Sequence, residues 1–272
     1  MASIEPGVTG GRWPIPHGAT GISRFMLAVV ASAFLCWNGL AQQPPVPTPP
    51  PPPERPDLPA LPAPPVNRIS VQPAFLVVID PAHGGADTGA RLSNNALEKD
   101  ITLGMSVRLR SALAARGIAV VTTRESDSDP SPDERAGVAN HALASACLVI
   151  HATASGSGVH LFTSSLGPAP AAPGGMVPWR TAQAAWIPRS LRLSSELNSN
   201  LGQAGIPVTL GSTALQPLDS LACPAVAIEI APLLASPANK AMAITDPQYQ
   251  QHILDALVAA ALEWSADWKQ QP

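Results

Sequence analysis

The sequence predicts one α/β domain with a mostly parallel sheet and helices on both faces. Two observations indicate this fold class. Short apolar runs of strand length recur along the chain, among them "FLVVID" at 75–80, "IAVVTTR" at 118–124 and "CLVIHA" at 147–152. Segments with a helical period separate these runs, and continuous apolar runs are typical of strands that are buried on both faces of a sheet.

The first strand, at 75–80, is followed by a helical segment at 101–117 and a second strand at 118–124. Asp100 can cap the start of this helix and Gly117 can end it. Strand, helix and strand in this order predict a right-handed parallel crossover. The buried face of the helix repeats every four residues, at Ile101, Met105, Leu109 and Leu113.

The second half of the domain repeats the alternation. Ser131 and Glu134 form a capping box, with Pro132 at the first helical position, and this predicts a helix before the strand at 147–152. The remaining elements are predicted as a strand at 158–164, a helix at 190–205, a strand at 224–230 and a closing helix at 247–268. This domain spans residues 68–272.

The N-terminal quarter has a different composition. Residues 1–41 form a leader in which Arg24 precedes an apolar run, and residues 42–67 are a linker that takes much of the chain's 32 prolines. Such a linker is expected to be a semi-rigid polyproline II spacer. The apolar segment at 25–41 is interpreted as a secretory signal peptide or as a retained anchor in the inner membrane, and either predicts export to the periplasm or cell envelope.

The net charge and the cysteines exclude some classes of function and of binding site. The formal net charge is -3 with no cluster of basic residues, so no nucleic acid partner is expected. Cys147 and Cys223 could form one disulfide in an oxidising compartment, but two small buried side chains are the interpretation we favour from sequence. Neither cysteine has the spacing of a metal ligand.

Polar side chains follow the predicted strands at one edge of the sheet, where ligands bind in parallel α/β folds. His83, His151 and Glu229 end three of these strands, and Glu98 comes from the loop before the first helix. Two histidines and one glutamate are the ligand set of a catalytic zinc site. We therefore expect His83, Glu98 and His151 to bind Zn²⁺, and Glu229 to be the general base.

Each of these residues, taken singly, is more often a hydrogen-bonded core residue or a helix cap, so the prediction depends on the set. Asp80 is expected to orient a neighbour or accept loop N–H groups. The other histidines are not predicted to be functional. His141 and His252 lie in helices, and His160 reaches the edge only with an unfavourable strand register.

Four stretches together carry a resemblance: "VVIDPAHGGADTGA", "LEKDITLGMSVRLRSALAARGIAVVTTRESD", "PDERAGVANHALASACLVIHA" and "PAVAIEI". In this order they resemble the motifs of the zinc-dependent N-acetylmuramoyl-L-alanine amidases of bacterial cell walls. The resemblance implies one α/β domain, Zn²⁺ as cofactor, and hydrolysis of the amide between N-acetylmuramic acid and L-alanine in peptidoglycan. By position it gives His83, Glu98 and His151 as zinc ligands and Glu229 as the catalytic glutamate.

The sequence departs from the family at Ala82, Thr153 and the pair Ala231 and Pro232. These departures leave open a non-catalytic peptidoglycan-binding protein of the same fold. A zinc peptidase that acts on stem peptides is a further alternative, because it shares the chemistry and differs only in the bond cut. Some family members carry an inserted helix that a partner removes, so an activator protein is a further candidate partner.

The segment at 164–189 has no clear helical period and predicts an irregular flap. Its Trp179 and Trp186 either stack on substrate or fix the segment to the domain, and we favour the second role.

Overall fold

The computed structural model describes residues 75–170 and 178–270. The predicted leader, linker and anchor, at 1–41, 42–67 and 25–41, lie outside the described residues. Within the described ranges, no helix is long and apolar enough to cross a membrane.

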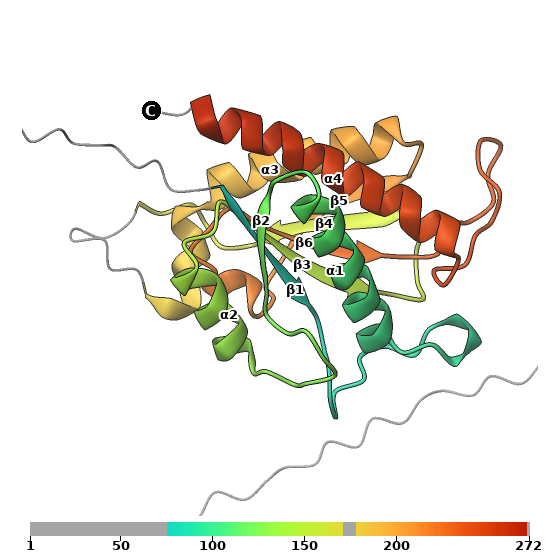
Figure 1. Ribbon diagram of the computed structural model, residues 1–272, viewed down its shortest axis with the longest axis horizontal. Coiled ribbons are helices and arrows are strands. Elements are labelled where there is room, and N and C mark those ends of the chain that lie inside the picture. Colours follow the sequence, from blue (N-terminus) through green and yellow to red (C-terminus); the bar gives the residue numbers. More distant parts are fainter. Residues whose placement is uncertain (1–74, 171–177, 271–272) are drawn as a thin grey trace, which may run out of the picture. The chain divides into compact units, whose positions relative to one another are not determined.

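One sheet forms the centre of the domain (Figure 1). Its strands are β1 (Leu76–Pro81), β2 (Ala119–Thr122), β3 (Ala146–Ala152), β4 (Val159–Ser164), β5 (Val208–Thr213) and β6 (Ala225–Ile230). They lie in the order β2-β1-β3-β6-β4-β5. Four of the five strand pairings are parallel, so the predicted fold class is confirmed.

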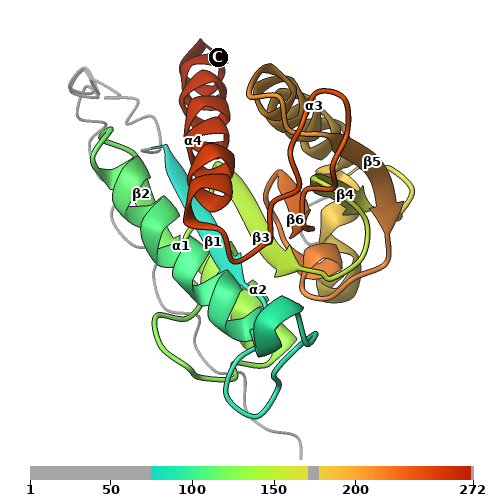
Figure 2. The same cartoon turned by 90° about the vertical axis from the view of Figure 1, so that its right-hand side faces the viewer.

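Helices cover both faces of this sheet. They are α1 (Glu98–Ala114), α2 (Pro132–His141), α3 (Ile187–Gln203) and α4 (Pro247–Gln270), with 3₁₀ turns η1 (Ser93–Asn95), η2 (Trp179–Ala185) and η3 (Leu218–Ser220). Figure 2 shows α4 between α1 and α3, and the apolar side chains of these three helices share one core with Val77 and Ile79 of β1. On the opposite face, Val78 packs in a second core with Ala136 of α2 and Leu218 of η3.

Two features of the sheet differ from the prediction. The strand at 158–164 is present as β4, but it runs antiparallel to β6. The strand β5 was not predicted, because most of its residues are exposed at the edge of the sheet and form no apolar run. Apolar patterns indicate strands that are buried, and an exposed edge strand has few buried side chains to form such a pattern.

Helix boundaries also differ in two places. The helix α1 begins at Glu98, so Asp100 lies in its first turn and does not cap it. The segment at 164–189, predicted as an irregular flap, contains η2, and α3 begins directly after Trp186. The capping box of α2 is confirmed, since Ser131 and Glu134 exchange hydrogen bonds between side chain and backbone.

The interpretation of the two cysteines as unpaired small side chains was wrong. Cys147 and Cys223 form a disulfide within the second core, and both residues are almost fully buried. Cys147 pairs with Ala225 in the sheet, and this register places it two residues from Cys223 across the strands. A register of this kind cannot be read from two cysteines 76 residues apart.

The disulfide predicts a measurable share of the stability. A double Cys147→Ala and Cys223→Ala variant is expected to lose about 3–4 kcal/mol of unfolding free energy, because the bridge closes a long loop in the unfolded chain. Urea denaturation of the oxidised protein and the variant measures this loss. Equal midpoints and slopes for the two proteins would show that the bridge does not form in solution.

Candidate metal centre

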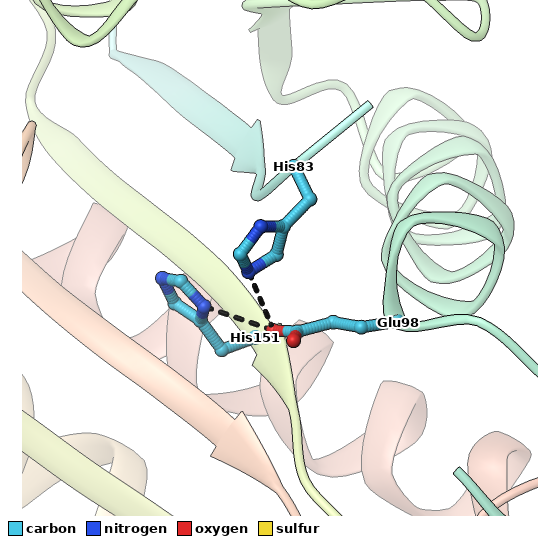
Figure 3. A group of neighbouring side chains, drawn as sticks. All are labelled: His83, Glu98 and His151. Carbon is cyan, nitrogen blue, oxygen red and sulfur yellow. Dashed lines mark hydrogen bonds and ion pairs between the residues drawn. The ribbon is translucent and has the colours of Figure 1, made fainter. Parts of the chain in front are cut away.

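The predicted ligands come from three separate elements. His83 lies two residues beyond the end of β1, His151 is near the end of β3, and Glu98 is the first residue of α1. The parallel pairing of β1 and β3 brings the first two to the same edge of the sheet. The loop after β1 then returns along that edge to start α1, which brings Glu98 to the same place (Figure 3).

The carboxylate of Glu98 lies between the two imidazole rings. Its Oε1 is 3.2 Å from Nε2 of His83 and 3.0 Å from Nδ1 of His151. The backbone N–H of Ala152 donates to Oε1 and that of Ala90 donates to Oε2, at 3.1 and 2.8 Å. Glu98 is thus buried, and both of its oxygens accept hydrogen bonds.

The donor set fits a metal ion. One ligand atom from each of His83, Glu98 and His151 can be chosen so that all three lie within 4.8 Å of one another. In addition, Nε2 of His151 is buried and has no hydrogen-bond partner among the described residues. Two imidazoles and one carboxylate suit zinc and related divalent ions. The cluster is therefore a candidate metal site made entirely of the predicted ligands.

The electrostatics of the cluster favour a positive charge between the ligands. Burial opposes ionisation of Glu98, but hydrogen bonds from His151 and His83 outweigh it, and the pKa of Glu98 lies well below its usual value. The hydrogen bond to Glu98 raises the pKa of His83 to about 9, against a partial opposing effect of burial. A proton on His83 thus provides a charge that a bound cation would replace.

The backbone at His83 has a positive φ of 60°, a conformation that is uncommon outside glycine. Two buried arginines hold this turn by its carbonyl oxygens. Arg135 donates to the carbonyls of Pro81 and His83, at 2.7 and 2.8 Å. Arg124 donates to those of Pro81 and Ala82, at 2.9 and 3.1 Å.

The carboxylate of Asp80 pairs with Arg135 at 2.8 Å. Asp80 lies outside the ligand cluster and orients a neighbour, as the sequence predicted. Arg124 and Arg135 were not predicted to support the site, since an arginine in a helix or after a strand is usually a surface residue.

Asp87 is a further residue that the sequence analysis missed. Its Oδ2 lies 2.7 Å from Nδ1 of His83, and this hydrogen bond lowers the pKa of Asp87. A carboxylate on the second ring nitrogen fixes the orientation of a ligating histidine. Its position four residues after His83, in a glycine-rich turn, is the signal that could have identified it. Gly89 lies against His83 and Glu98, since a Cβ there would come within 2.7 Å of both side chains.

The proposed base, Glu229, lies beside the ligands on β6. Its register partner on β3 is His151, and its partner on β4 is His160. The expectation that His160 reaches this edge only with an unfavourable register was wrong, because Nδ1 of His160 is 2.8 Å from Oε2 of Glu229. The reason is strand direction. Because β4 is antiparallel to β6, its first residues lie at the edge where the last residues of β6 lie.

Two cavities open beside these residues. One of about 200 Å³ is lined by His83, Asp87 and His151, together with Ser131 and Gln216. A second, of about 210 Å³, is lined by His151, Glu229 and Phe162. His151 and Leu215 border both cavities, so the ligand cluster and Glu229 line neighbouring cavities.

The remaining candidates of the sequence lie elsewhere. His141 and His252 are exposed on α2 and α4. Trp179 donates its indole N–H to Asp133 at 3.1 Å, and the ring of Trp186 lies under the guanidinium of Arg189, 5.7 Å from its centroid. The contact of Trp179 with Asp133 of α2 agrees with a role in fixing the segment to the domain, whereas the contact of Trp186 with Arg189 lies within the segment.

The fold and the cluster define a class: α/β proteins with one mostly parallel sheet and a candidate metal site of two histidines and one carboxylate at its carboxyl edge. The family model described as N-acetylmuramoyl-L-alanine amidase matches residues 77–263. The chain therefore belongs to the N-acetylmuramoyl-L-alanine amidase family.

Curated relatives match over shorter stretches. The germination-specific N-acetylmuramoyl-L-alanine amidase of Bacillus subtilis is 44% identical over 62 residues, which are 23% of this chain and 26% of that protein. The amidase AmiA of Escherichia coli is 38% identical over 77 residues, which are 28% of this chain and 27% of that protein. These matches cover about a quarter of the length of either relative.

Solved structures show the same fold at low identity. The catalytic domain of CwlV from Bacillus (Paenibacillus) polymyxa has a TM-score of 0.54 at 22% identity, over 70% of this chain and 97% of that one. The amidase Ami1 of Mycobacterium smegmatis has a TM-score of 0.55 at 21% identity, over 72% and 99%.

The raised pKa of His83 predicts that metal binding releases a proton. Zn²⁺ added to protein made metal-free by chelation at pH 7.5 should displace about one proton, and the apparent affinity should rise about tenfold per pH unit until pH approaches 9. Isothermal titration calorimetry in buffers of different ionisation enthalpy measures the proton count. A count of zero at pH 7.5 would contradict the ion pair between His83 and Glu98.

The arginine contacts predict that Arg135 supports metal binding without being a ligand. An Arg135→Lys variant keeps the charge beside Asp80 but cannot reach both carbonyls, so zinc affinity should fall about 10–100-fold. Competition with a chromophoric chelator measures the affinity. Arg192→Lys, at an exposed ion pair with Asp267, is the matched control and should bind zinc like the wild type. An unchanged affinity in Arg135→Lys would overturn the role given to this contact.

Proposed function

We propose that this protein is a zinc-dependent hydrolase of peptidoglycan that cleaves the amide bond between N-acetylmuramic acid and L-alanine. The observation that carries the proposal is the placement of Glu229 next to His151 in the sheet, beside a cluster of His83, Glu98 and His151. Family membership supports the choice of bond, since the matching model is that of N-acetylmuramoyl-L-alanine amidases.

In this proposal His83, Glu98 and His151 hold the zinc ion. A zinc ion bound there would supply a Lewis acid for the scissile carbonyl and lower the pKa of an attacking water to about 7. Asp87 orients the ring of His83 through Nδ1, and Arg135 and Arg124 hold the turn that carries this ring. These residues keep the ligands in one geometry throughout the reaction.

Glu229 is the proposed general base and acid. Its carboxylate takes a proton from the attacking water, so that the water oxygen can bond to the carbonyl carbon. The same carboxyl group then gives the proton to the nitrogen of L-alanine as the carbon–nitrogen bond breaks. The side chain is one-third exposed, which leaves room for a substrate atom beside it.

Export is proposed together with this activity. The leader at 1–41 is proposed to direct the chain out of the cytoplasm, as a cleaved signal peptide or as an inner-membrane anchor through residues 25–41. The linker at 42–67 then separates the domain from the membrane. The disulfide between Cys147 and Cys223 supports export, because such bonds persist in oxidising compartments such as the periplasm.

An activator protein is a proposed partner. A related amidase, CwlD of Clostridioides difficile, was solved in complex with the GerS lipoprotein, and that chain has a TM-score of 0.54 with this one. The comparison motivates a search for a partner in the envelope.

The proposed activity is tested with the full chain, loaded with zinc and incubated with purified peptidoglycan. Mass spectrometry should identify free stem peptides that begin at L-alanine, and a chelator should abolish their release. Glu229→Gln should lower turnover by about 10²–10⁴-fold while it retains zinc, because the amide cannot accept the proton. Glu263→Gln, on the exposed side of α4, is the matched control and should be fully active.

Other results would replace the proposal. Peptides cut at another bond would indicate a zinc peptidase, and retention on peptidoglycan without release would indicate a binding protein. Full activity of Glu229→Gln would show that another group is the base.

A further inference from the structure

We propose that His160 is a positioning residue that holds the carboxylate of Glu229 in its reactive orientation; the inference rests on the proposed function. The two side chains are register partners on adjacent strands and therefore project from the same face of the sheet. With His151 on the next strand, they form a row across β3, β6 and β4 in the order His151, Glu229, His160.

The contact between His160 and Glu229 is short and partly shielded from solvent. The distance from Nδ1 to Oε2 is 2.8 Å, and the histidine and glutamate side chains are 15% and 33% exposed. A charged acceptor makes such a hydrogen bond about twice as strong as a neutral one. The bond is local to the proposed base and touches none of the three candidate metal ligands.

The loop before β4 packs against the Cε1 and Nε2 atoms of the His160 ring. A Cβ on Gly156 would lie 2.6 Å from Nε2 and 2.4 Å from Cε1 of His160, so only glycine leaves space for the ring. Gly156 also has a φ of +85°, which glycine adopts without strain. The rings of His160 and Phe162 lie edge to face along β4, with 6.4 Å between their centroids. The imidazole therefore has one favoured position, with Nδ1 toward Glu229.

Glu229 needs such a partner because its own side chain is long and partly exposed. Within the part of the chain that is described, its hydrogen bond from His160 is the side-chain contact that fixes Oε2. Among the described residues no side chain bonds to Oε1, and Glu229 lines a cavity together with His151. A carboxylate held by one oxygen keeps the other in one place, and a proton acceptor must lie within hydrogen-bond reach of the water it activates.

The chemistry assigns each nitrogen of His160 a role. With a proton on Nδ1 the ring donates to Oε2, and Nε2 faces the Gly156 loop. The proton from the attacking water goes to Oε1 of Glu229 and from there to the leaving nitrogen. His160 gains and loses no proton in this sequence, so it acts through Glu229 and is not itself a base.

Two substitutions separate this role from packing. In His160→Asn the side-chain Nδ2 lies where Nδ1 of histidine lies and can still donate to Glu229. In His160→Gln the amide lies one bond further out, where Nε2 was, and faces the Gly156 loop. The amide group is the same in both, but only the first preserves the donor. His252→Gln, exposed on α4, is the matched control.

Turnover of peptidoglycan by zinc-loaded full-length protein is the first measurement. His160→Gln should lower kcat by about tenfold with little change in KM, and His160→Asn should stay within about threefold of the wild type. Zinc content should equal that of the wild type in both variants. Equal losses in the two variants, or full activity in His160→Gln, would overturn the proposal.

A second measurement does not depend on turnover. Nitrogen-15 NMR of the imidazole rings should show His160 with its proton on Nδ1 in the wild type, and a shift toward the Nε2 form in Glu229→Ala. If the wild type does not cleave peptidoglycan, the proposed function fails. The tautomer of His160 then tests by itself whether Nδ1 donates to Glu229. A wild-type His160 protonated on Nε2 would refute the positioning role in either case.

Discussion

The carboxylate of Glu98 is the group on which the arrangement of the site depends. It is buried at the start of α1 and shares one oxygen between His83 and His151. A buried carboxylate without partners would cost several kcal/mol, so the surrounding elements must bring positive charge or donors to it. Two histidines and two backbone N–H groups do so, and they tie the ends of β1 and β3 to the first turn of α1.

The loop after β1 follows from this constraint. His83 can reach Glu98 only if the chain turns sharply after Pro81, and the positive φ at His83 is part of that turn. Buried arginines stabilise it because they donate to the carbonyl oxygens of Pro81 and His83. Arg135 pairs with Asp80 of β1 and donates to the carbonyl oxygen of His83. It thus connects the sheet to a candidate metal ligand.

Sequence patterns predicted the parts of this protein that depend on burial and local capping. The apolar run at 75–80 became β1 within one residue, and Ser131 with Glu134 began α2 as expected. What could not be predicted depends on pairing between distant strands. The antiparallel direction of β4 decides that His160 meets Glu229, and the register of β3 with β6 decides that Cys147 meets Cys223. The residues of a single strand indicate neither the direction of its neighbour nor the register in which the two strands pair.

The two glutamates of the site differ in their hydrogen bonds and exposure, and these differences match the two roles proposed for them. Both oxygens of Glu98 accept hydrogen bonds, three donors meet at Oε1 alone, and the side chain is buried. Such a carboxylate stays ionised and is suited to hold a cation. Glu229 is one-third exposed, and His160 engages only one of its oxygens. The difference in donors and exposure therefore suits Glu98 to the proposed role of metal ligand and Glu229 to the proposed role of general base.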